Sequence, residues 1–366
     1  MIFQWYIFAI IVAVWLLSPL FNQVYTVHLS KWEKKIEYRW MAVLFIMIPL
    51  IYFAGMRGDT VWSDTPAYRA LYDELPSSIS GLADYFTDDF KDKGFIVFSV
   101  IIKHIAGGNS NIFFSIIAAI CLICVIVTYK KYSSNFIVSI LLFVVSADYL
   151  QWTYNGIRQF IPVAILFACA GLIARKKYVP VIILIILLSS IHATALLMLP
   201  VIFIVSGRSF NKKTLLFLIG ILLAIGFIDH FTNIIADFMQ NSQYSQEVDQ
   251  FLSTEGTSIQ RVIVYSVPSF LAILLRKRII MKNDVVLNVC VNMSLMTSGI
   301  YLLSAFSSGL FLGRLPIYFS LYNYILLPWE IETAFDKKTE RLLYVMMISF
   351  YLIYYVYQTR YVWKIL

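Results

Sequence analysis

Apolar runs of nearly twenty residues recur from one end of this 366-residue sequence to the other. An α-helix rises 1.5 Å per residue, so about 20 apolar residues cross the roughly 30 Å hydrocarbon core of a bilayer. The composition agrees, because 60% of the residues are apolar and only 14% are charged, whereas soluble domains carry about 25% charged residues. The sequence therefore predicts an all-α, multi-pass integral membrane protein. It excludes a soluble enzyme, a disordered chain and a nucleic-acid-binding module.

Twelve transmembrane helices are expected, which together form a single transmembrane domain over residues 1–366. Their approximate ranges are 2–21, 39–55, 110–128, 134–149, 157–174, 178–190, 193–206, 214–231, 259–275, 283–304, 311–328 and 341–357. No basic residue precedes the first run, so we interpret it as a membrane helix and not as a secretory signal. The short stretch 94–106 contains Lys103 and His104 and is interpreted as a re-entrant or surface-lying helix. The run 178–206 is expected to be a hairpin of two short helices.

The distribution of charge assigns the two sides of the membrane. With these spans, the loops on one side hold 19 Lys and Arg against 7 Asp and Glu, and the other side holds 10 against 14. Cytoplasmic loops of membrane proteins carry the excess of basic residues. Both termini and two larger loops, 56–93 and 232–258, are therefore expected in the periplasm. The net charge of +8 is a topology signal and not a nucleic-acid footprint.

The first periplasmic loop contains the pattern of a short amphipathic helix. Thr65 followed by Pro66 is typical of a helix start, with a capping hydroxyl and then proline in the first turn. Asp64, Tyr68 and Tyr72 are spaced by four, so they share one face. We expect this helix to lie on the outer membrane surface, where its N-terminus suits a phosphate group. The ordinary alternative is that Asp64 only caps the helix.

Ionisable residues at membrane depth are costly, so they are functional candidates. Five of them fall near span ends on the predicted outer side: Arg57, Asp64, Arg158, His192 and Arg314. They come from five separate parts of the chain, and we expect them to meet in one outward-facing cavity. The alternatives are arginines that reach toward lipid headgroups and a histidine that is hydrogen-bonded by Ser189 or Ser190 at a helix break.

Polar neighbours accompany two of these arginines. Asn155 and Gln159 lie beside Arg158 at a predicted span mouth, and Tyr318 follows Arg314 by four residues on one expected helix face. Such groups bind phosphate or sugar hydroxyls. The sequence has no Gly-rich phosphate loop, no metal-ligand cluster and no G-x-S-x-G motif. Its four cysteines lie in apolar runs and are interpreted as core residues. No metal and no cofactor is therefore expected.

Together these motifs resemble the EpsG/Wzy type of bacterial polysaccharide polymerase. The resemblance rests on an arginine after an early span (Arg57), D-T-x-x-Y at 64–68, an R-Q pair at 158–159, the string SSIHATALLMLP at 189–200, and R-x-x-x-Y at 314–318. It covers roughly residues 40–330. The sequence departs from the family pattern just before Asp64, where tryptophan and serine replace an expected valine–glycine pair.

The resemblance implies a glycosyltransferase in the bacterial inner (cytoplasmic) membrane, with its active site facing the periplasm. Such an enzyme transfers a growing O-antigen or exopolysaccharide chain from undecaprenyl pyrophosphate to a lipid-linked repeat unit. The implied partners are an undecaprenyl-pyrophosphate-linked oligosaccharide, the lipid bilayer and a chain-length regulator protein. Nucleic acid is not among them.

The leaving group of this reaction is a pyrophosphate, which arginine forks bind bidentately. We expect Arg158 and Arg314 to form the clamp, with Arg57 third, and Asp64 or His192 to act on the acceptor hydroxyl. The other expected substrate-binding residues are Thr65, Tyr68, Asn155, Gln159 and Tyr318.

Three other functions remain open from the sequence. A flippase for the lipid-linked sugar would suit twelve spans, but the sequence lacks an internal repeat and its candidate charges lie on one side. An O-antigen ligase would share the chemistry, although its usual large outer loop is longer than either loop here. A membrane acyltransferase would need a histidine near the membrane midplane, for which His192 is a poor match.

Overall fold

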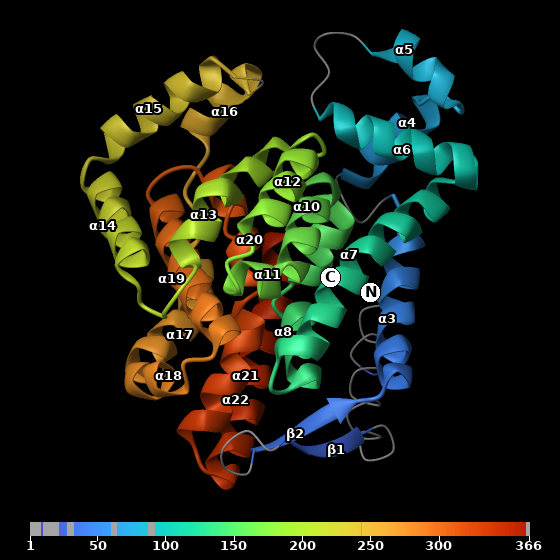
Figure 1. The fold of residues 1–366 in the computed structure, drawn as a ribbon. Helices are drawn as coiled ribbons and strands as arrows, with labels where there is room; N and C mark the ends of the chain where they lie inside the picture. Colours follow the sequence, from blue (N-terminus) through green and yellow to red (C-terminus); the bar gives the residue numbers. More distant parts are fainter. Residues whose placement is uncertain are drawn as a thin grey trace. The chain divides into compact units, whose positions relative to one another are not determined.

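The elements of the computed structural model are helices apart from one hairpin, within the part of the chain that the structure describes (Figure 1). The described residues are 9, 22–27, 33–59, 64–86, 92–242 and 244–363. The predicted helical class is confirmed, whereas the expected first span, 2–21, falls almost wholly outside the described residues. Strands β1 (Asn22–Val27) and β2 (Glu33–Tyr38) pair antiparallel. The sequence predicts only a loop between the first two spans, so these strands are a difference.

The chain forms two compact units. The first contains residues 1–168, 183–196 and 335–366, and the second contains residues 169–182 and 197–334. That the whole chain is one transmembrane domain stays a prediction.

In the first unit, a long helix packs between two shorter ones. Helix α7 (Ser110–Tyr132) contacts α3 (Trp40–Gly55) and α10 (Ile157–Ala168), and α8 (Phe136–Val145) contacts α22 (Lys337–Tyr357), which continues as η6 (Gln358–Val362). Their contact surfaces are almost entirely aliphatic and aromatic. Side-chain oxygens of Asn109 and Asn135 accept the first free N–H groups of α7 and α8, so each helix begins at a capped residue.

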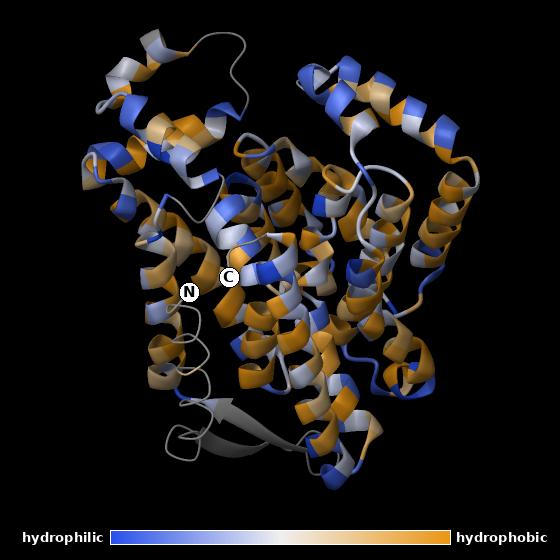
Figure 2. Cartoon of the chain, turned by 180° about the vertical axis from the view of Figure 1, so that it is seen from behind, coloured by the Kyte–Doolittle hydropathy of each residue, from blue (hydrophilic) through white to orange (hydrophobic). Residues whose placement is uncertain are grey.

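Shorter helices with more polar residues form a group at one end of α7 (Figures 1 and 2). They are α4 (Asp64–Glu74), η1 (Ile79–Gly81), α5 (Leu82–Tyr85), α6 (Lys93–Ala106), α9 (Asp148–Leu150) and the π-helix η2 (Gln151–Asn155). Two of them, α4 and α6, contact α7. The helix expected in loop 56–93 is confirmed. Helix α6 covers the stretch 94–106 and, at 14 residues, is not among the described helices that are long and apolar enough to span a bilayer.

The hairpin expected over 178–206 is also confirmed. Helix α12 (Tyr178–Ser189) is followed by a break, then by η3 (Ala193–Leu197) and α13 (Met198–Val205). The rings of Tyr178 and Phe203 lie 4.6 Å apart, so the second arm returns to the start of the first.

In the second unit, α19 (Val285–Ala305) is the central helix and is mostly buried. It contacts α11 (Ala170–Ala174), α14 (Lys212–Gly226), α17 (Ile259–Leu274) and α21 (Asn323–Ala334). Its start is fixed by the Asp284 carboxylate, which accepts the N–H groups of two first-turn residues at 2.9 Å.

Two pairs of consecutive helices in this unit are joined by sharp bends. Helix α15 (Ile228–Gln240) turns 101° from α14, and α18 (Arg276–Lys282) turns 73° from α17. The expected loop 232–258 is mostly helical, because α15 is followed by η4 (Ser245–Glu247) and α16 (Val248–Ser253). The apolar side of α15 packs in a hydrophobic cluster that includes Phe251. Burial of these apolar side chains stabilises the helices of this loop.

The single helix expected over 311–328 is wrong. The segment is broken into η5 (Leu312–Arg314) and α20 (Ile317–Ser320), and α21 begins only at Asn323. Pro316, the residue just before α20, accounts for the break between Arg314 and Ile317, because proline has no N–H to bond to the preceding turn. Close backbone packing also shapes the chain just before this segment. The Gly309 N–H donates to the Glu255 carbonyl at 2.9 Å, and an added Cβ at Gly309 would come within 3 Å of that backbone. This contact requires glycine at position 309 and holds the chain that leads into η5.

The expected number of spans is not confirmed. Three described helices are long and apolar enough to cross a bilayer, at 110–132, 285–305 and 337–362, or up to six candidates if each sharply bent helix pair counts as one span. Four other expected spans correspond to shorter apolar helices at 40–55, 157–168, 178–189 and 193–205. Three of these helices match their apolar runs to within one residue, whereas the run 157–174 is divided at Cys169 into α10 and α11.

Candidate functional site

Four of the five ionisable candidates belong to the first unit, and the fifth, Arg314, belongs to the second. In the first unit, Arg57, Asp64 and Arg158 are linked by the short segment Gln151–Asn155 and the residues around it. The contacts of each residue show which of them is already neutralised within the protein.

Arg57 follows the end of α3 and is only 5% exposed. One terminal nitrogen, Nη1, donates to the carbonyl of Thr153, and the guanidinium carbon lies 3.7 Å from the centre of the Phe114 ring. The other two nitrogens, Nε and Nη2, are buried without a hydrogen-bond partner. Among the described residues, no carboxylate forms an ion pair with Arg57.

Burial lowers the pKa of Arg57 from its ordinary value to about 10, and the nearby tyrosines Tyr154 and Tyr68 oppose this shift. A pKa of about 10 still leaves roughly one molecule in a thousand neutral at pH 7, so the group is a cation. A buried charge without a counter-ion is strongly unfavourable. The Phe114 ring and one carbonyl offset part of this cost, and an anion would offset the rest.

Helix α4 is fixed at its start by a distant side chain. The backbone N–H of Asp64 donates to Oδ1 of Asn155 at 3.2 Å, so the helix includes Asp64 and begins earlier than expected. The expected cap at Thr65 is wrong, because its hydroxyl is buried without a partner. Tyr68 and Tyr72 form the buried face. The predicted grouping of these residues on one face is confirmed, and this face packs on protein.

The end of α4 is held by Lys103, a residue that the sequence analysis did not assign to the site. Its Nζ donates to the carbonyls of Tyr72, Asp73 and Leu75 at 2.7, 2.9 and 2.7 Å. The ammonium group therefore caps the C-terminus of the helix, where carbonyls lack partners and the helix dipole favours a cation. A lysine in the apolar run 94–106 was the sequence signal.

Arg158 lies in the first turn of α10 and is partly neutralised. Its Nε donates to the Tyr68 hydroxyl and its Nη1 to Asp92 Oδ2, both at 3.4 Å, and its side chain is 41% exposed. Burial raises the pKa of Tyr68, and the adjacent Arg158 opposes this shift. Gln159 is buried in the same turn. The long bonds of Arg158 leave it able to exchange Asp92 for another anion.

His192 lies at the break between α12 and η3. Its Nδ1 is 3.4 Å from the backbone nitrogen and 2.7 Å from the hydroxyl of Thr194. A backbone N–H can only donate, so Nδ1 accepts and the neutral ring carries its proton on Nε2. A hydrogen-bonded histidine at the break was the alternative considered from the sequence, and Thr194 is such a partner, whereas the hydroxyls of Ser189 and Ser190 donate to carbonyls of their own helix.

The break at His192 adjoins the start of α6. The Gly94 N–H donates to the Ser190 carbonyl at 2.8 Å, and a Cβ at Gly94 would overlap Ser190. Gly94 comes two residues after Asp92, the partner of Arg158. A continuous series of contacts therefore leads from Arg158 to the helix break that holds His192.

Arg69 is a second residue that the sequence analysis missed. It binds Asp59 at 2.8 Å and Asn111 at 3.2 Å, and it also donates to Ser110. Its Nη2 lies 3.4 Å from the carbonyl of Arg57. Arg69 thus ties the segment after α3 to the start of α7. Its position in the middle of α4 gave no signal for this role.

The expected pairing of Arg314 with Tyr318 on one helix face is wrong. Arg314 lies on η5 and is exposed, whereas Tyr318 lies on α20 and is buried. The break described above separates them. That Arg314 joins the residues of the first unit in one cavity stays a prediction. Among the described residues, no group of three or more His, Cys, Asp or Glu is arranged to hold a metal ion.

Comparison with known proteins gives one positive result. No curated protein and no solved structure matches the chain. The model of the EpsG family matches residues 40–364, a range that includes every candidate site residue. Since this match covers most of the sequence, the chain belongs to the EpsG family.

Proposed function

We propose that this protein is a polysaccharide repeat-unit polymerase of the bacterial inner membrane. It transfers a growing glycan from undecaprenyl pyrophosphate to a lipid-linked repeat unit on the periplasmic face. Family membership and the apolar helices support a membrane protein of the polysaccharide-polymerase type. In this proposal its partners are the lipid-linked oligosaccharide, the bilayer and a chain-length regulator protein.

The buried guanidinium of Arg57 carries the proposal. Two of its nitrogens lack partners, its charge lacks a counter-ion among the described residues, and an aromatic ring fixes its plane. A pyrophosphate leaving group brings negative charge and several acceptor oxygens, and a guanidinium fork binds such a group bidentately. Arg57 therefore moves from third to first in the clamp. Arg158 is second, since Asp92 already occupies part of its fork.

In the proposed reaction, the acceptor hydroxyl oxygen attacks the anomeric carbon of the donor chain. The bond from that carbon to the pyrophosphate oxygen breaks, and the arginines stabilise the charge that develops on the leaving oxygen. A base takes the hydroxyl proton. We assign this role to the Asp64 carboxylate and not to His192, because Nδ1 of His192 already accepts from Thr194. The Nε2–H of His192 would then donate to a sugar or phosphate oxygen.

Complementation of a polymer-deficient strain tests the proposal, with the polysaccharide ladder on a gel as the readout. Arg57→Gln should abolish the ladder while the protein still accumulates in the membrane. Arg39→Gln is the matched control, because Arg39 flanks the other end of α3 and is exposed. A full-length ladder from Arg57→Gln would refute the assignment of this residue to the clamp.

A further inference from the structure

A second group of cations lies in the second unit, on the short helix α18. Arg276, Lys277, Arg278 and Lys282 occupy four of its seven positions, and the helix contains no acidic residue. Among the described residues, no carboxylate forms an ion pair with the first three of these. The nearest acid along the chain is Asp284, whose carboxylate is already used to cap α19.

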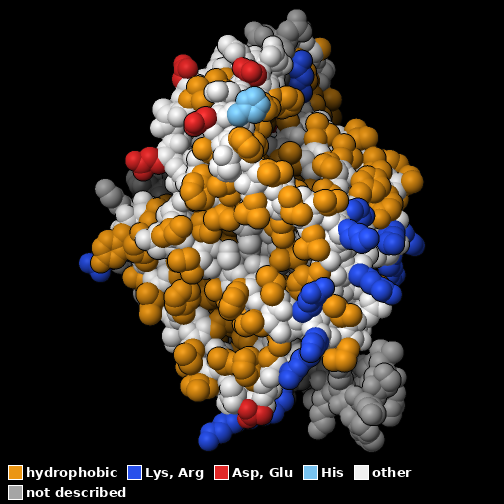
Figure 3. All heavy atoms as spheres, turned by 90° about the vertical axis from the view of Figure 1, so that its left-hand side faces the viewer, with side chains coloured by type: hydrophobic (Ala, Val, Ile, Leu, Met, Phe, Trp, Pro, Cys, Tyr) orange, Lys and Arg blue, Asp and Glu red, His pale blue; other side chains and the backbone are white. Residues whose placement is uncertain are grey.

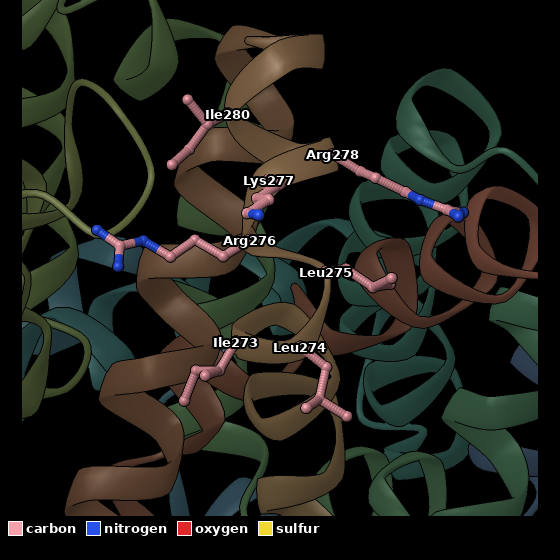
Figure 4. A pocket seen from close by; sticks show the side chains of 7 residues that line it. All are labelled: Ile273, Leu274, Leu275, Arg276, Lys277, Arg278 and Ile280. Atoms are coloured by element: carbon pink, nitrogen blue, oxygen red, sulfur yellow. The ribbon is translucent and has the colours of Figure 1, made fainter.

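Three of these cations border a hollow at the bend between α17 and α18. The hollow has a volume of about 690 Å³, and apolar residues of both helices line it together with Arg276, Lys277 and Arg278. Figure 4 shows Arg276 and Arg278 extending to opposite sides, with Lys277 between them. Ile273 and Leu274 lie on the α17 side of these three.

Contacts at their far ends hold both arginines in place. The guanidinium of Arg276 lies 5.7 Å from the ring of Phe210, and Arg278 donates to the carbonyl of Thr333 in α21. Ile279 is fully buried and anchors α18 itself. The hollow is thus framed by fixed positive charge on two sides, which distinguishes it from a set of freely moving surface lysines.

An apolar stripe on α17 leads into this hollow. Ile263, Val267, Phe270 and Leu274 follow one another at helical spacing, and all four are exposed, with Leu274 at 65%. From Ile263 to Leu274 the stripe is about 16 Å long, at 1.5 Å per residue. One leaflet of the hydrocarbon core is about 15 Å deep. On one face of the molecule, Figure 3 shows Lys and Arg side chains gathered along a border of an apolar surface.

We propose that the bend between α17 and α18 binds an anionic phospholipid of the bilayer. The phosphate of the headgroup lies at Lys277, between the positive charges of Arg276 and Arg278, and one acyl chain lies along the α17 stripe. Charge favours an anionic headgroup, since each nearby cation contributes to its binding. The exposed stripe favours a lipid over a free phosphate or a nucleic acid, neither of which would cover apolar side chains. The positive-inside rule places this site in the cytoplasmic leaflet.

The test uses the full-length protein extracted from bilayers that contain equal amounts of phosphatidylglycerol and phosphatidylcholine. Native mass spectrometry gives the ratio of the two lipids retained by the protein. The wild-type protein should retain phosphatidylglycerol preferentially, and inorganic pyrophosphate should not displace it. In R276Q/K277Q/R278Q the preference should fall about tenfold or more, because the three positive charges that attract the headgroup are lost.

The matched control is R175Q/K176Q/K177Q, which removes the same charge from the loop between α11 and α12 in the same unit. Its preference should stay within about twofold of wild type. Equal losses in both triple variants would show a general charge effect and overturn the site, as would displacement by pyrophosphate. Should the α18 triple variant fail to fold, Lys277→Gln decides the matter, because this side chain is exposed and changing it should not disturb folding. An unchanged preference there would refute the proposal.

Discussion

Arg57 and the cations on α18 carry the same charge, but Arg57 is buried and the α18 cations are exposed to solvent. Arg57 is 5% exposed, lies on an aromatic ring and has two nitrogens without partners. On α18 the cations are exposed and border an open apolar hollow. In the second region water screens each charge, so any bound anion gains little from one cation. In the first region one cation can decide the binding of an anion, because the surrounding dielectric is low.

The same contrast exists within the first unit. Arg57 and Arg69 lie 3.7 and 5.4 Å from the centre of the Phe114 ring. Arg69 has Asp59, Ser110 and Asn111 as partners, whereas Arg57 has one carbonyl. Arg69, whose side chain has several partners, contributes to the fold. Arg57 keeps two nitrogens without partners, and these are available to a ligand. Removing each should therefore change different properties of the protein.

The largest expected effect is that of Arg57→Met on polymer synthesis. Loss of a buried charge-assisted contact to the leaving group should lower the rate at least about 100-fold. The folded protein should not lose stability, because an apolar side chain replaces a buried and uncompensated charge. Ladder synthesis and a thermal unfolding curve in detergent measure the two properties. A parallel loss of both would mean that Arg57 is a structural residue.

Lys103→Met should have the next largest effect. It removes three bonds from a buried ammonium to the carbonyls at the end of α4. Bonds to charged groups contribute about 1.5–3 kcal/mol each in favourable cases, and some of these carbonyls would find water instead. We expect α4 to open locally while α7 and α10 stay protected. Hydrogen exchange of residues 64–75 measures this, and unchanged protection there would contradict the capping role.

Arg69→Met should destabilise the protein by about 1–2 kcal/mol, because polar partners in a half-buried position lose a charged donor. Polymer synthesis per folded molecule should change much less than in Arg57→Met. This variant separates the two arginines that share the Phe114 ring. If Arg69→Met abolished synthesis without any loss of stability, the contrast between them would be wrong.

The sequence predicts those parts of this fold that depend on interactions between residues close together in the chain. Apolar runs and the N-cap asparagines Asn109 and Asn135 indicate helices because the capping bonds are short-range. The break between Arg314 and Ile317 was missed, although Pro316 lies within it. The contact of Gly309 with Glu255 joins distant segments and has no local signal. The expected span count is not confirmed for a related reason. Hydropathy gives the length of an apolar run, but bends of 73° and 101° decide how much of it forms one straight helix.

The candidate site shows the same limit. Spacing by four placed Tyr68 and Tyr72 on one face of α4, and the helix geometry confirms it. The sequence did not indicate that Asn155, about ninety residues away, would cap that helix in place of Thr65. It also ranked Arg57 below Arg158, because both looked like arginines at span ends. Only burial and partners, which arise from packing, distinguish the unpaired arginine from the one that binds Asp92.

The smallest expected effect is that of Lys277→Gln, and it sharpens the comparison between the two regions. A single exposed cation near a bilayer surface contributes about 1 kcal/mol to binding an anionic headgroup, so the preference for phosphatidylglycerol should fall no more than about fivefold. At low salt a measurable fall, close to this fivefold, is expected. The effect should shrink at high salt, where the Debye length falls to about 3 Å at 1 M. Salt should weaken the binding of inorganic pyrophosphate at Arg57 much less, because that guanidinium is buried. Native mass spectrometry for the lipid and calorimetry for pyrophosphate, each in low and high salt, measure the two slopes. Equal slopes would mean that water reaches both sites alike and that burial does not separate the two groups of cations.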